Sequence, residues 1–198
     1  MTFLLYGCDL FNRRYEFNSN YYYYGPSYSD WLASTDRNNG ILYISGEINV
    51  FGISDTCRRV NILDSDDKII RITIFINSNG GSADAMREFY NGINNCKKPI
   101  DIVVVGNAHS AAFGILQMAT GKRIARSNAL MMVHAPHING PDNTDTKYAI
   151  DFESKFYEDL LIKRCKFPNE WMPLNVTMRF MNSLEALKFN AIDEISDK

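Results

Sequence analysis

Apolar and polar positions alternate between strand-like runs and helix-like spacings from residue 41 onward. Residues 41–44 form a short apolar run, which predicts a buried strand. The next apolar positions are spaced as on one face of a helix: Val50, Ile53, Cys57 and Val60. The first unit of the chain is therefore predicted to be a strand followed by a helix.

The same alternation follows twice more. Residues 72–76 are a β-prone run, and the apolar positions after it have the spacing of one helix face: Met86, Phe89, Tyr90 and Ile93. Residues 100–105 are almost continuously apolar, which is typical of a parallel strand buried on both faces. Residues 110–119 are apolar on all sides, so this second helix is expected inside the protein.

The last third of the chain predicts one more strand and two helices. Residues 129–133 form an apolar run that leads directly into His134. Residues 144–165 are expected to form a long helix, with apolar positions at i, i+4 and i+8: Phe152, Phe156 and Leu160. A short helix is expected from near Asn182 to before Ile192. Repeated strand–helix units predict an α/β protein with a parallel sheet.

Residues 1–40 have a different composition, rich in Tyr, Asn and Ser, with little periodicity. We interpret them as a divergent N-terminal extension and residues 41–198 as the folded domain, because 198 residues suit one domain of ordinary size. The tyrosines of residues 21–24 are expected to pack against the body or a neighbouring subunit. An aromatic binding surface is the alternative.

Composition and charge exclude several classes of function. A formal net charge of −2 gives no basic footprint, so no nucleic-acid partner is expected. No apolar stretch reaches the roughly 18 residues that span a bilayer, and the first ten residues lack the features of a signal peptide. The sequence therefore predicts a cytoplasmic protein without a membrane partner.

The cysteines and histidines give no metal pattern. The four cysteines are scattered without a C-x-x-C pair and are expected to be reduced thiols: Cys8, Cys57, Cys96 and Cys165. The three histidines have no ligand-spaced partner. No metal or cofactor is expected.

Unusual residues follow three of the predicted strands: residues 78–82, residues 106–110 and His134. Functional groups gather at the carboxyl ends of parallel strands, so one site is expected to collect all three segments. Gly80 and Gly81 permit a turn that leaves backbone N–H groups free for an oxyanion hole. The alternative is a tight turn that requires glycine for steric reasons alone.

Ser110 begins the buried helix, where a serine most often caps the helix. A nucleophilic serine needs a base beside it, and His134 ends the neighbouring strand. His109 and His137 are the alternative bases, ranked lower because His109 adjoins Ser110 in sequence and His137 lies in a predicted loop. Ser110 is therefore the candidate nucleophile and His134 its base.

Several segments, in order, resemble the Clp protease proteolytic subunit (ClpP) family. Residues 76–82 are similar to its Ile-Asn-Ser-Pro-Gly-Gly-Ser motif, with Asn79 in place of proline. Residues 106–112 are similar to its nucleophile segment, Gly-Gln-Ala-Ala-Ser-Met-Gly. Residues 132–136 and 180–187 also match family segments.

The resemblance implies a ClpP/crotonase-like spiral of repeated βαβ units. It places the nucleophile at Ser110, the base at His134 and the oxyanion hole at the N–H groups of Gly81 and Ala111. It also implies stacked rings, as a homo-oligomer or a hetero-oligomer with another ClpP-like subunit, joined through the helix that begins at Thr144. An AAA+ unfoldase would deliver unfolded polypeptides and would itself bind the ATP.

The family's catalytic Asp has no counterpart at the matching position, which is Met178. Asn175 is the candidate substitute, because a shorter connection before Phe180 would bring it near His134. An amide orients the imidazole without stabilising its charge, and an Asp-to-Asn exchange in such a triad costs about 10⁴ in rate.

Three functions follow as hypotheses. The first is an ATP-dependent Clp-type serine endopeptidase that uses Ser110 and His134. The second is a weakly active or inactive ClpP-like ring subunit with a structural or regulatory role, which Met178 favours. The third is an acyl-CoA-processing enzyme of the crotonase type, which would need no Ser–His pair and is ranked last.

Overall fold

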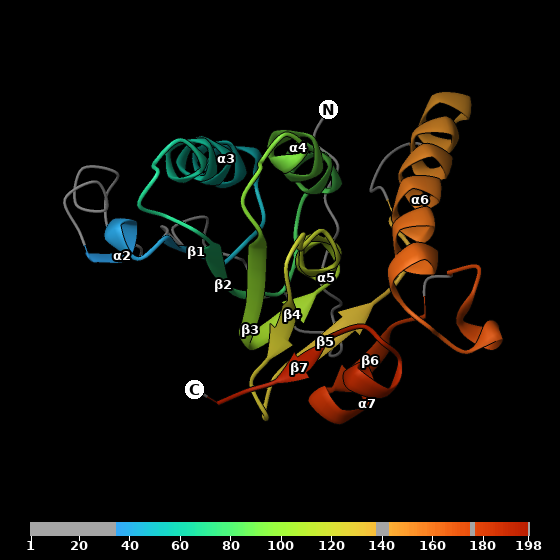
Figure 1. Cartoon of the computed structure of the whole chain (residues 1–198). Helices are drawn as coiled ribbons and strands as arrows, with labels where there is room; N and C mark the ends of the chain where they lie inside the picture. The colour runs from blue at the N-terminus through green and yellow to red at the C-terminus, as the bar shows by residue number, and fades with distance from the viewer. Residues whose placement is uncertain (1–34, 138–142, 175–176, 198) are drawn as a thin grey trace.

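The computed structural model of the chain describes residues 35–137, 143–174 and 177–197 (Figure 1). Almost all of the predicted N-terminal extension lies outside these residues, so its boundary at residue 41 stays a prediction. The helices and strands are, in chain order, α2 (Thr35–Asn38), β1 (Ile41–Ser45), α3 (Val50–Asp64), β2 (Ile72–Ser78), α4 (Ala83–Ile93), β3 (Ile100–His109), α5 (Ala111–Gln117), β4 (Arg123–Ala125), β5 (Leu130–Val133), α6 (Thr144–Arg164), the 3₁₀ turn η1 (Asn169–Trp171), β6 (Arg179–Asn182), α7 (Ser183–Lys188) and β7 (Glu194–Ile195).

One sheet contains all the strands of the described residues. Its main path runs β1-β2-β3-β4-β7 and is parallel throughout, while β5 pairs in parallel with β3, and β6 pairs antiparallel with β5. The helices α3 and α4 connect successive parallel strands and lie together on one face of the sheet (Figure 1). The prediction of repeated strand–helix units with a parallel sheet is confirmed.

The core lies between this sheet and its helices. The inward positions of β2 are fully buried at Ile72, Ile74 and Ile76, and α4 faces them with Met86 and Phe89. All the residues of α5 are buried, as its uniformly apolar sequence predicts. The helix that carries the candidate nucleophile at its start is therefore enclosed by protein on every side.

The strand β3 is longer than its apolar run indicates, because it changes partner along its length. Residues 102–104 pair with β4, and the end of the strand pairs in parallel with β5: Asn107↔Leu130, Ala108↔Met131 and His109↔Met132. The predicted end at Val105 is wrong for this reason. Residues 107–109 gain strand structure from the partner strand rather than from their own propensity.

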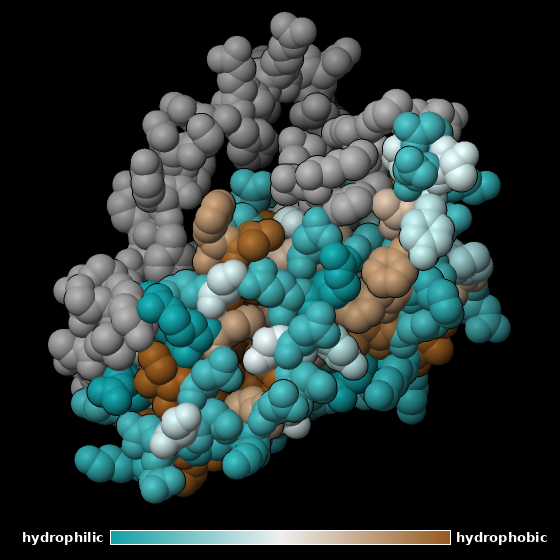
Figure 2. All heavy atoms as spheres, turned by 90° about the horizontal axis from the view of Figure 1, so that it is seen from above, coloured by the Kyte–Doolittle hydropathy of each residue, from teal (hydrophilic) through white to brown (hydrophobic). Residues whose placement is uncertain are grey.

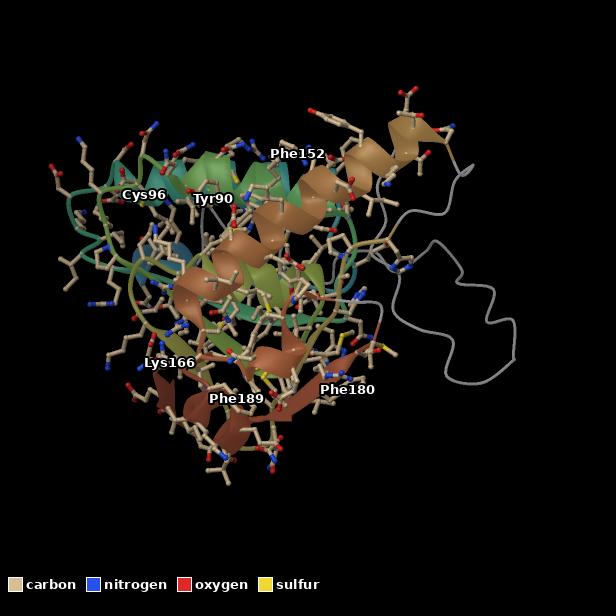
Figure 3. The ribbon with its side chains drawn as sticks, turned by 90° about the vertical axis from the view of Figure 1, so that its right-hand side faces the viewer. Tyr90, Cys96, Phe152, Lys166, Phe180 and Phe189 are labelled. Atoms are coloured by element: carbon tan, nitrogen blue, oxygen red, sulfur yellow. The ribbon has the colours of Figure 1, made fainter. Side chains whose placement is uncertain are left out.

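Helix α6 lies beside α4 and α5. Its N-terminus is capped by Asn143, whose Oδ1 accepts a hydrogen bond from the N–H of Thr146 at 2.9 Å. Figure 3 shows α6 crossing next to α4, with Tyr90 and Phe152 at the margin of the contact. Tyr90 packs edge-on against Phe156, with ring centroids 5.5 Å apart. This seam fixes the long helix against the rest of the domain.

The face seen from above carries hydrophobic side chains in separate groups among hydrophilic ones (Figure 2). Exposed apolar residues of α6 include Tyr148, which is 73% exposed, and Ile162, which is 64% exposed. In the described part of the chain, no helix combines the length and the apolar character needed to cross a membrane.

Candidate active site

Three strand ends meet at one place, as the sequence predicts. The Ser110 Oγ lies 2.9 Å from Nε2 of His134, which follows β5. The turn after β2 reaches the same place, because a Cβ added to Gly80 would lie 2.8 Å from the Ser110 Cβ. The structure thus brings the serine, the histidine and the glycine turn together at the carboxyl edge of the parallel strands.

Ser110 has an unusual backbone conformation between β3 and α5. Its φ of 56° and ψ of −122° lie outside the regions that non-glycine residues ordinarily occupy. Its hydroxyl makes no capping hydrogen bond to α5, so the helix-cap alternative is wrong. The strained backbone instead directs the hydroxyl to the imidazole of His134.

Three hydrogen bonds hold this conformation. The Ser110 N–H donates to the carbonyl of Met132 on the adjacent strand at 2.8 Å. The Ser110 carbonyl accepts from the N–H of Gly114 and from the hydroxyl of Tyr157, both at 3.1 Å. Tyr157 is fully buried on α6, so the long helix takes part in positioning the serine. This role could not be recognised in the sequence, since Tyr157 resembles any core aromatic residue.

His134 is buried, with an exposed fraction of 4%. Burial lowers its pKa to about 4, and repulsion from His137 acts in the same direction, while a hydrogen bond with the Ala135 backbone acts in the opposite one. At neutral pH the imidazole is therefore uncharged. A neutral imidazole is the form that accepts a proton from a serine hydroxyl.

The acid that usually accompanies such a pair has no counterpart among the described residues. Within them, no Asp or Glu oxygen lies within 4.0 Å of a His134 ring nitrogen. Met178, at the matching position, is partly exposed. Asn175 lies outside the described residues, so its role as a substitute stays a prediction.

The glycine turn has a backbone conformation that other residues adopt only at a cost. Gly80 and Gly81 have φ values of 100° and 151°, and a Cβ on Gly81 would lie 2.2 Å from the Ile48 carbonyl oxygen. Ile48 bonds to both neighbours of Gly81: its N–H donates to the Gly80 carbonyl, and its carbonyl accepts from the Ser82 N–H, both at 2.8 Å. The Gly81 N–H takes no part in this bridge.

The Ala111 N–H lies on the other side of Ser110. Ala111 is the first residue of α5, and the N–H groups of a first helical turn have no intrahelical partner. A Cβ added to Gly80 would lie 3.3 Å from this nitrogen, so the glycine turn and the start of α5 are in close contact. The two N–H groups expected to form the oxyanion hole therefore come from segments that meet at Ser110.

The other two histidines are close to the site, but neither contacts the Ser110 hydroxyl. The His109 ring packs edge-on against Phe180 with centroids 5.7 Å apart, and its Nε2 is buried without a partner among the described residues. Burial lowers the pKa of His109. The His137 ring lies 5.7 Å from the His134 ring, with the planes inclined at 50°. Sequence spacing did not reveal this His134–His137 neighbourhood.

The cysteines of the described residues form no disulfide. Cys57, Cys96 and Cys165 are free thiols, and Cys8 lies outside those residues. Burial raises the pKa of Cys57 and of Cys96 to about 11 and that of Cys165 to about 12. No group of three or more His, Cys, Asp or Glu within the described ranges could hold a metal ion.

The fold and the site define an α/β protein of the ClpP/crotonase-like class, with a Ser–His pair at the carboxyl ends of parallel strands. The chain belongs to the Clp protease family, whose profile, described as "Clp protease", matches residues 29–198. The resemblance read from the motifs is thus confirmed. The chain is accordingly a Clp-type protease subunit.

Similar proteins carry matching names. The chain is 28% identical over 163 residues to ATP-dependent Clp protease proteolytic subunit 2 of Leifsonia xyli subsp. xyli, covering 78% of this chain and 73% of the relative. It is 26% identical over 162 residues to proteolytic subunit 1 of Bifidobacterium longum, covering 78% and 70%. The chloroplastic subunit 3 of Arabidopsis thaliana is 26% identical over 164 residues, covering 79% of this chain and 53% of the relative.

Proposed function

We propose that the protein is a serine-type endopeptidase, the proteolytic subunit of a Clp-like compartmental protease acting on unfolded polypeptides. The observation that carries the proposal is the 2.9 Å contact between Ser110 Oγ and His134 Nε2 in a buried site. The strained backbone of Ser110 supports it, because strain of this kind persists where the surrounding structure holds a functional side chain in place.

In the proposed mechanism, Ser110 Oγ attacks the carbonyl carbon of the scissile peptide while His134 Nε2 takes its proton. The carbonyl oxygen becomes an oxyanion and accepts hydrogen bonds from the N–H groups of Gly81 and Ala111, each donor contributing about 3 kcal/mol. His134 then gives the proton to the leaving nitrogen, and the C–N bond breaks. Water, deprotonated by His134, releases the acyl group as a carboxylic acid and restores the serine.

No carboxylate lies beside His134 in the described residues. This lowers the expected reaction rate but leaves the sequence of steps unchanged. A carboxylate fixes the tautomer of the imidazole and stabilises the imidazolium that forms. Burial already lowers the pKa of His134 to about 4, so its protonated form is disfavoured here. We expect acylation to be slow for this reason, with a rate well below that of a complete triad.

The test is labelling of the purified, assembled protein with a fluorophosphonate probe. Wild type is expected to be labelled, and Ser110→Ala is expected to lose the label entirely. Ser65→Ala is the matched control, because its hydroxyl bonds to the carbonyl of Asn61 at the end of α3 and lies outside the site. Label that persists in Ser110→Ala would contradict the assignment of the nucleophile.

The second candidate is a weakly active or inactive ring subunit that acts beside an active ClpP-like chain. Met178 and the lack of a carboxylate near His134 in the described residues favour it. Absence of label in a properly assembled wild type, together with co-purification of a second ClpP-like chain, would support this function. A homo-oligomer that cleaves peptides by itself would exclude it.

The partners belong to the same proposal. Exposed apolar residues on α6, such as Tyr148 and Ile162, support contact with another subunit, because an exposed apolar helix face is unfavourable in water. Stacked rings, a homo- or hetero-oligomer and an AAA+ unfoldase are the partners we propose. A cytoplasmic location stays a prediction. Light scattering of the purified chain gives the subunit number directly.

A further inference from the structure

His137 is the polar side chain that the structure places against the base of the proposed mechanism. The centroids of the His134 and His137 rings are 5.7 Å apart, and their planes are inclined at 50°. His137 is partly buried, so it lies at the edge of the site and not in open solvent. In the ranges that the structure describes, no carboxylate oxygen comes within 4.0 Å of the His134 ring nitrogens.

The base needs a hydrogen-bond acceptor for its second nitrogen. When Nε2 of His134 faces the serine hydroxyl and accepts its proton, Nδ1 must carry the other proton. Something must accept a hydrogen bond from that Nδ1–H, because otherwise the imidazole is free to adopt the opposite tautomer or to rotate. A neutral imidazole has one unprotonated nitrogen that can do this.

The separation of the two rings suits this role. A direct N–H···N hydrogen bond between two imidazoles places their centroids roughly 5.2 Å apart. The observed 5.7 Å is longer by about 0.5 Å, and hydrogen bonds of a catalytic site are often long without substrate and shorten when it binds.

We propose that His137 is the positioning residue for His134, so that the site works as a Ser110–His134–His137 arrangement in place of a Ser–His–Asp triad. The inference rests on the proposed function. During acylation the Ser110 proton moves to His134 Nε2. The Nδ1–H of the resulting imidazolium donates a hydrogen bond to a ring nitrogen of His137. His137 itself gains and loses no proton. A neutral partner fixes the tautomer but adds no negative charge, so the imidazolium is stabilised less than by a carboxylate.

Two other groups compete for the same role. The Ala135 backbone has a hydrogen bond with His134, and its carbonyl could accept the Nδ1–H without any help from a side chain. Asn175, outside the described residues, is the substitute that the sequence suggests. The experiment therefore has to separate a histidine side chain from a backbone carbonyl and from an amide elsewhere.

The first measurement is the rate of Ser110-dependent fluorophosphonate labelling in four proteins: wild type, His137→Ala, His137→Gln and Asn175→Ala. We expect His137→Ala to be slower by about 10-fold or more, because a positioned general base contributes on the order of 10²–10⁴ to the rate. His137→Gln should recover most of the rate, because its amide oxygen accepts the same hydrogen bond. Asn175→Ala tests the competing assignment and should slow labelling less than His137→Ala does.

A wild-type rate in His137→Ala would overturn the inference and leave the Ala135 carbonyl as the acceptor. A loss in Asn175→Ala without a loss in His137→Ala would overturn it in favour of Asn175. Equal losses in His137→Ala and His137→Gln would also overturn it, because they would mean that His137 only fills space.

If wild type is not labelled, the proposed function is rejected. A second measurement tests the role of His137 in that case as well. The chain has three histidines, so selective ¹⁵N labelling gives three resolvable imidazoles. We expect His134 to be a single Nδ1–H tautomer in wild type and in His137→Gln, and a mixture of tautomers in His137→Ala. The same tautomer population in all three proteins would overturn the inference, whatever the activity.

Discussion

Ser110, Gly80 and Gly81 all have positive φ values, of 56°, 100° and 151° respectively. A Cβ at either glycine would collide with a backbone carbonyl oxygen. At Gly80 it would lie 2.7 Å from that of His109, and at Gly81 it would lie 2.2 Å from that of Ile48. At the scale of single residues, the proposed oxyanion hole therefore depends on a backbone that only glycine adopts without cost. Both the lack of space for a side chain and the backbone conformation of the proposed oxyanion hole explain the Gly-Gly pair in the sequence.

A substitution at Gly80 tests whether glycine is needed there because a side chain has no space or because φ is positive. Gly80→Ala is expected to destabilise the fold by about 1–3 kcal/mol and to slow labelling of Ser110 by about 10²-fold, because the new Cβ presses on the serine. Gly46→Ala is the matched control, since Gly46 has a φ of 78° but nothing within 4 Å of its added Cβ. Equal effects of the two substitutions would contradict the steric explanation.

The lowered pKa of His134 predicts an unusual pH dependence. Because burial lowers that pKa to about 4, the neutral base persists far below the ordinary histidine pKa of about 6.5. Labelling of Ser110 should therefore stay constant from pH 7 to about pH 5 and fall only as the pH approaches 4. An inflection of the labelling rate near pH 6.5 would contradict this.

The same shift affects stability in a defined direction. The folded-state pKa of His134 lies below the unfolded one, so between about pH 6.5 and 4 the unfolded chain binds more protons. The stability of the fold therefore decreases as the pH falls through that window. Tryptophan fluorescence recorded alongside each labelling reaction controls for loss of the folded state.

At the scale of helices and strands, local patterns predicted the elements whose signal is in their own sequence. The apolar runs at β1, β2 and β3 and the helical spacings at α3 and α4 are such cases. The strands β4, β6 and β7 were missed, because their structure depends on a distant partner: β4 and β7, for example, pair through Ile124↔Glu194 and Ala125↔Ile195. No periodicity develops over segments of two to four residues.

Helix α6 shows a second limit of local patterns. Its sequence spacing selects Phe152, Phe156 and Leu160, whereas the side chains buried along its main contact are Glu153, Tyr157 and Leu161. The buried row is displaced by one residue: Glu153 pairs with Arg87 of α4, while Phe152 lies outside, with the Arg87 guanidinium over its ring at 5.7 Å from the centroid. A buried acid of this kind cannot be recognised before its partner is known.

The site shows the same division between local and distant information. The order of the motifs predicted Ser110, His134 and the glycine turn, because each of them ends a strand of a parallel sheet. The positions of Tyr157 and His137 could not be predicted, since the first depends on how α6 packs and the second on the path of the chain after β5.

The Arg87–Glu153 ion pair joins α4 to α6 and predicts a measurable contribution to stability. The Glu153 side chain is only 4% exposed, so removal of its partner leaves a buried charge without compensation. Arg87→Ala should lower the free energy of unfolding by about 3 kcal/mol. Lys155→Ala on the same helix breaks an exposed pair with Asp159 and should cost less than about 1 kcal/mol.

Urea unfolding measures both variants. A double variant, Arg87→Met with Glu153→Leu, should recover much of the lost stability, because it removes both charges and keeps the volume. If Arg87→Ala and Lys155→Ala were equally mild, the pair would not be the link between the two helices.

At the scale of the whole molecule, Arg123 connects segments that are far apart in the chain. It is buried and bonds to both oxygens of Asp193, to Oε1 of Gln117 on α5, and to the carbonyls of Arg164 and Asn190. The end of α5, the end of α6 and the C-terminal segment therefore meet at one guanidinium. Because the Arg123 guanidinium is buried, these protein acceptors replace the water molecules that would otherwise bind it.

Loss of the partner carboxylate should destabilise the whole domain. Asp193→Ala leaves the buried Arg123 without its carboxylate partner and is expected to cost about 1.5–3 kcal/mol, because Asp193 is itself partly exposed and Arg123 keeps its other acceptors. Glu194→Ala is the control one residue away, because its pair with Lys122 is exposed and should contribute less than about 1 kcal/mol. Thermal unfolding of the two variants against wild type makes the comparison, and similar melting temperatures would show that Arg123 is adequately held without Asp193.

The acid dependence of this contact follows from the pKa of Asp193. Burial alone would raise that pKa, but hydrogen bonds from the side chain and backbone of Arg123 outweigh it and hold the value below its usual range. A lowered folded-state pKa means that the contribution to stability is present above the unfolded pKa and is lost as the pH falls through the folded one. The contact is therefore intact at neutral pH.

The proposed nucleophile and base are carried by strands that lie side by side: β3 leads into Ser110, β5 leads into His134, and His109 pairs in register with Met132. The two reacting groups are thus brought together first by backbone hydrogen bonds, at the roughly 4.8 Å spacing of adjacent strands, and the side chains around them then adjust their orientation. The alignment of Ser110 and His134 therefore does not depend on the residue at position 178. A substitution such as Met178 changes how well the imidazole carries charge while the serine and the histidine stay in register, so the chemistry can weaken by degrees without the site coming apart.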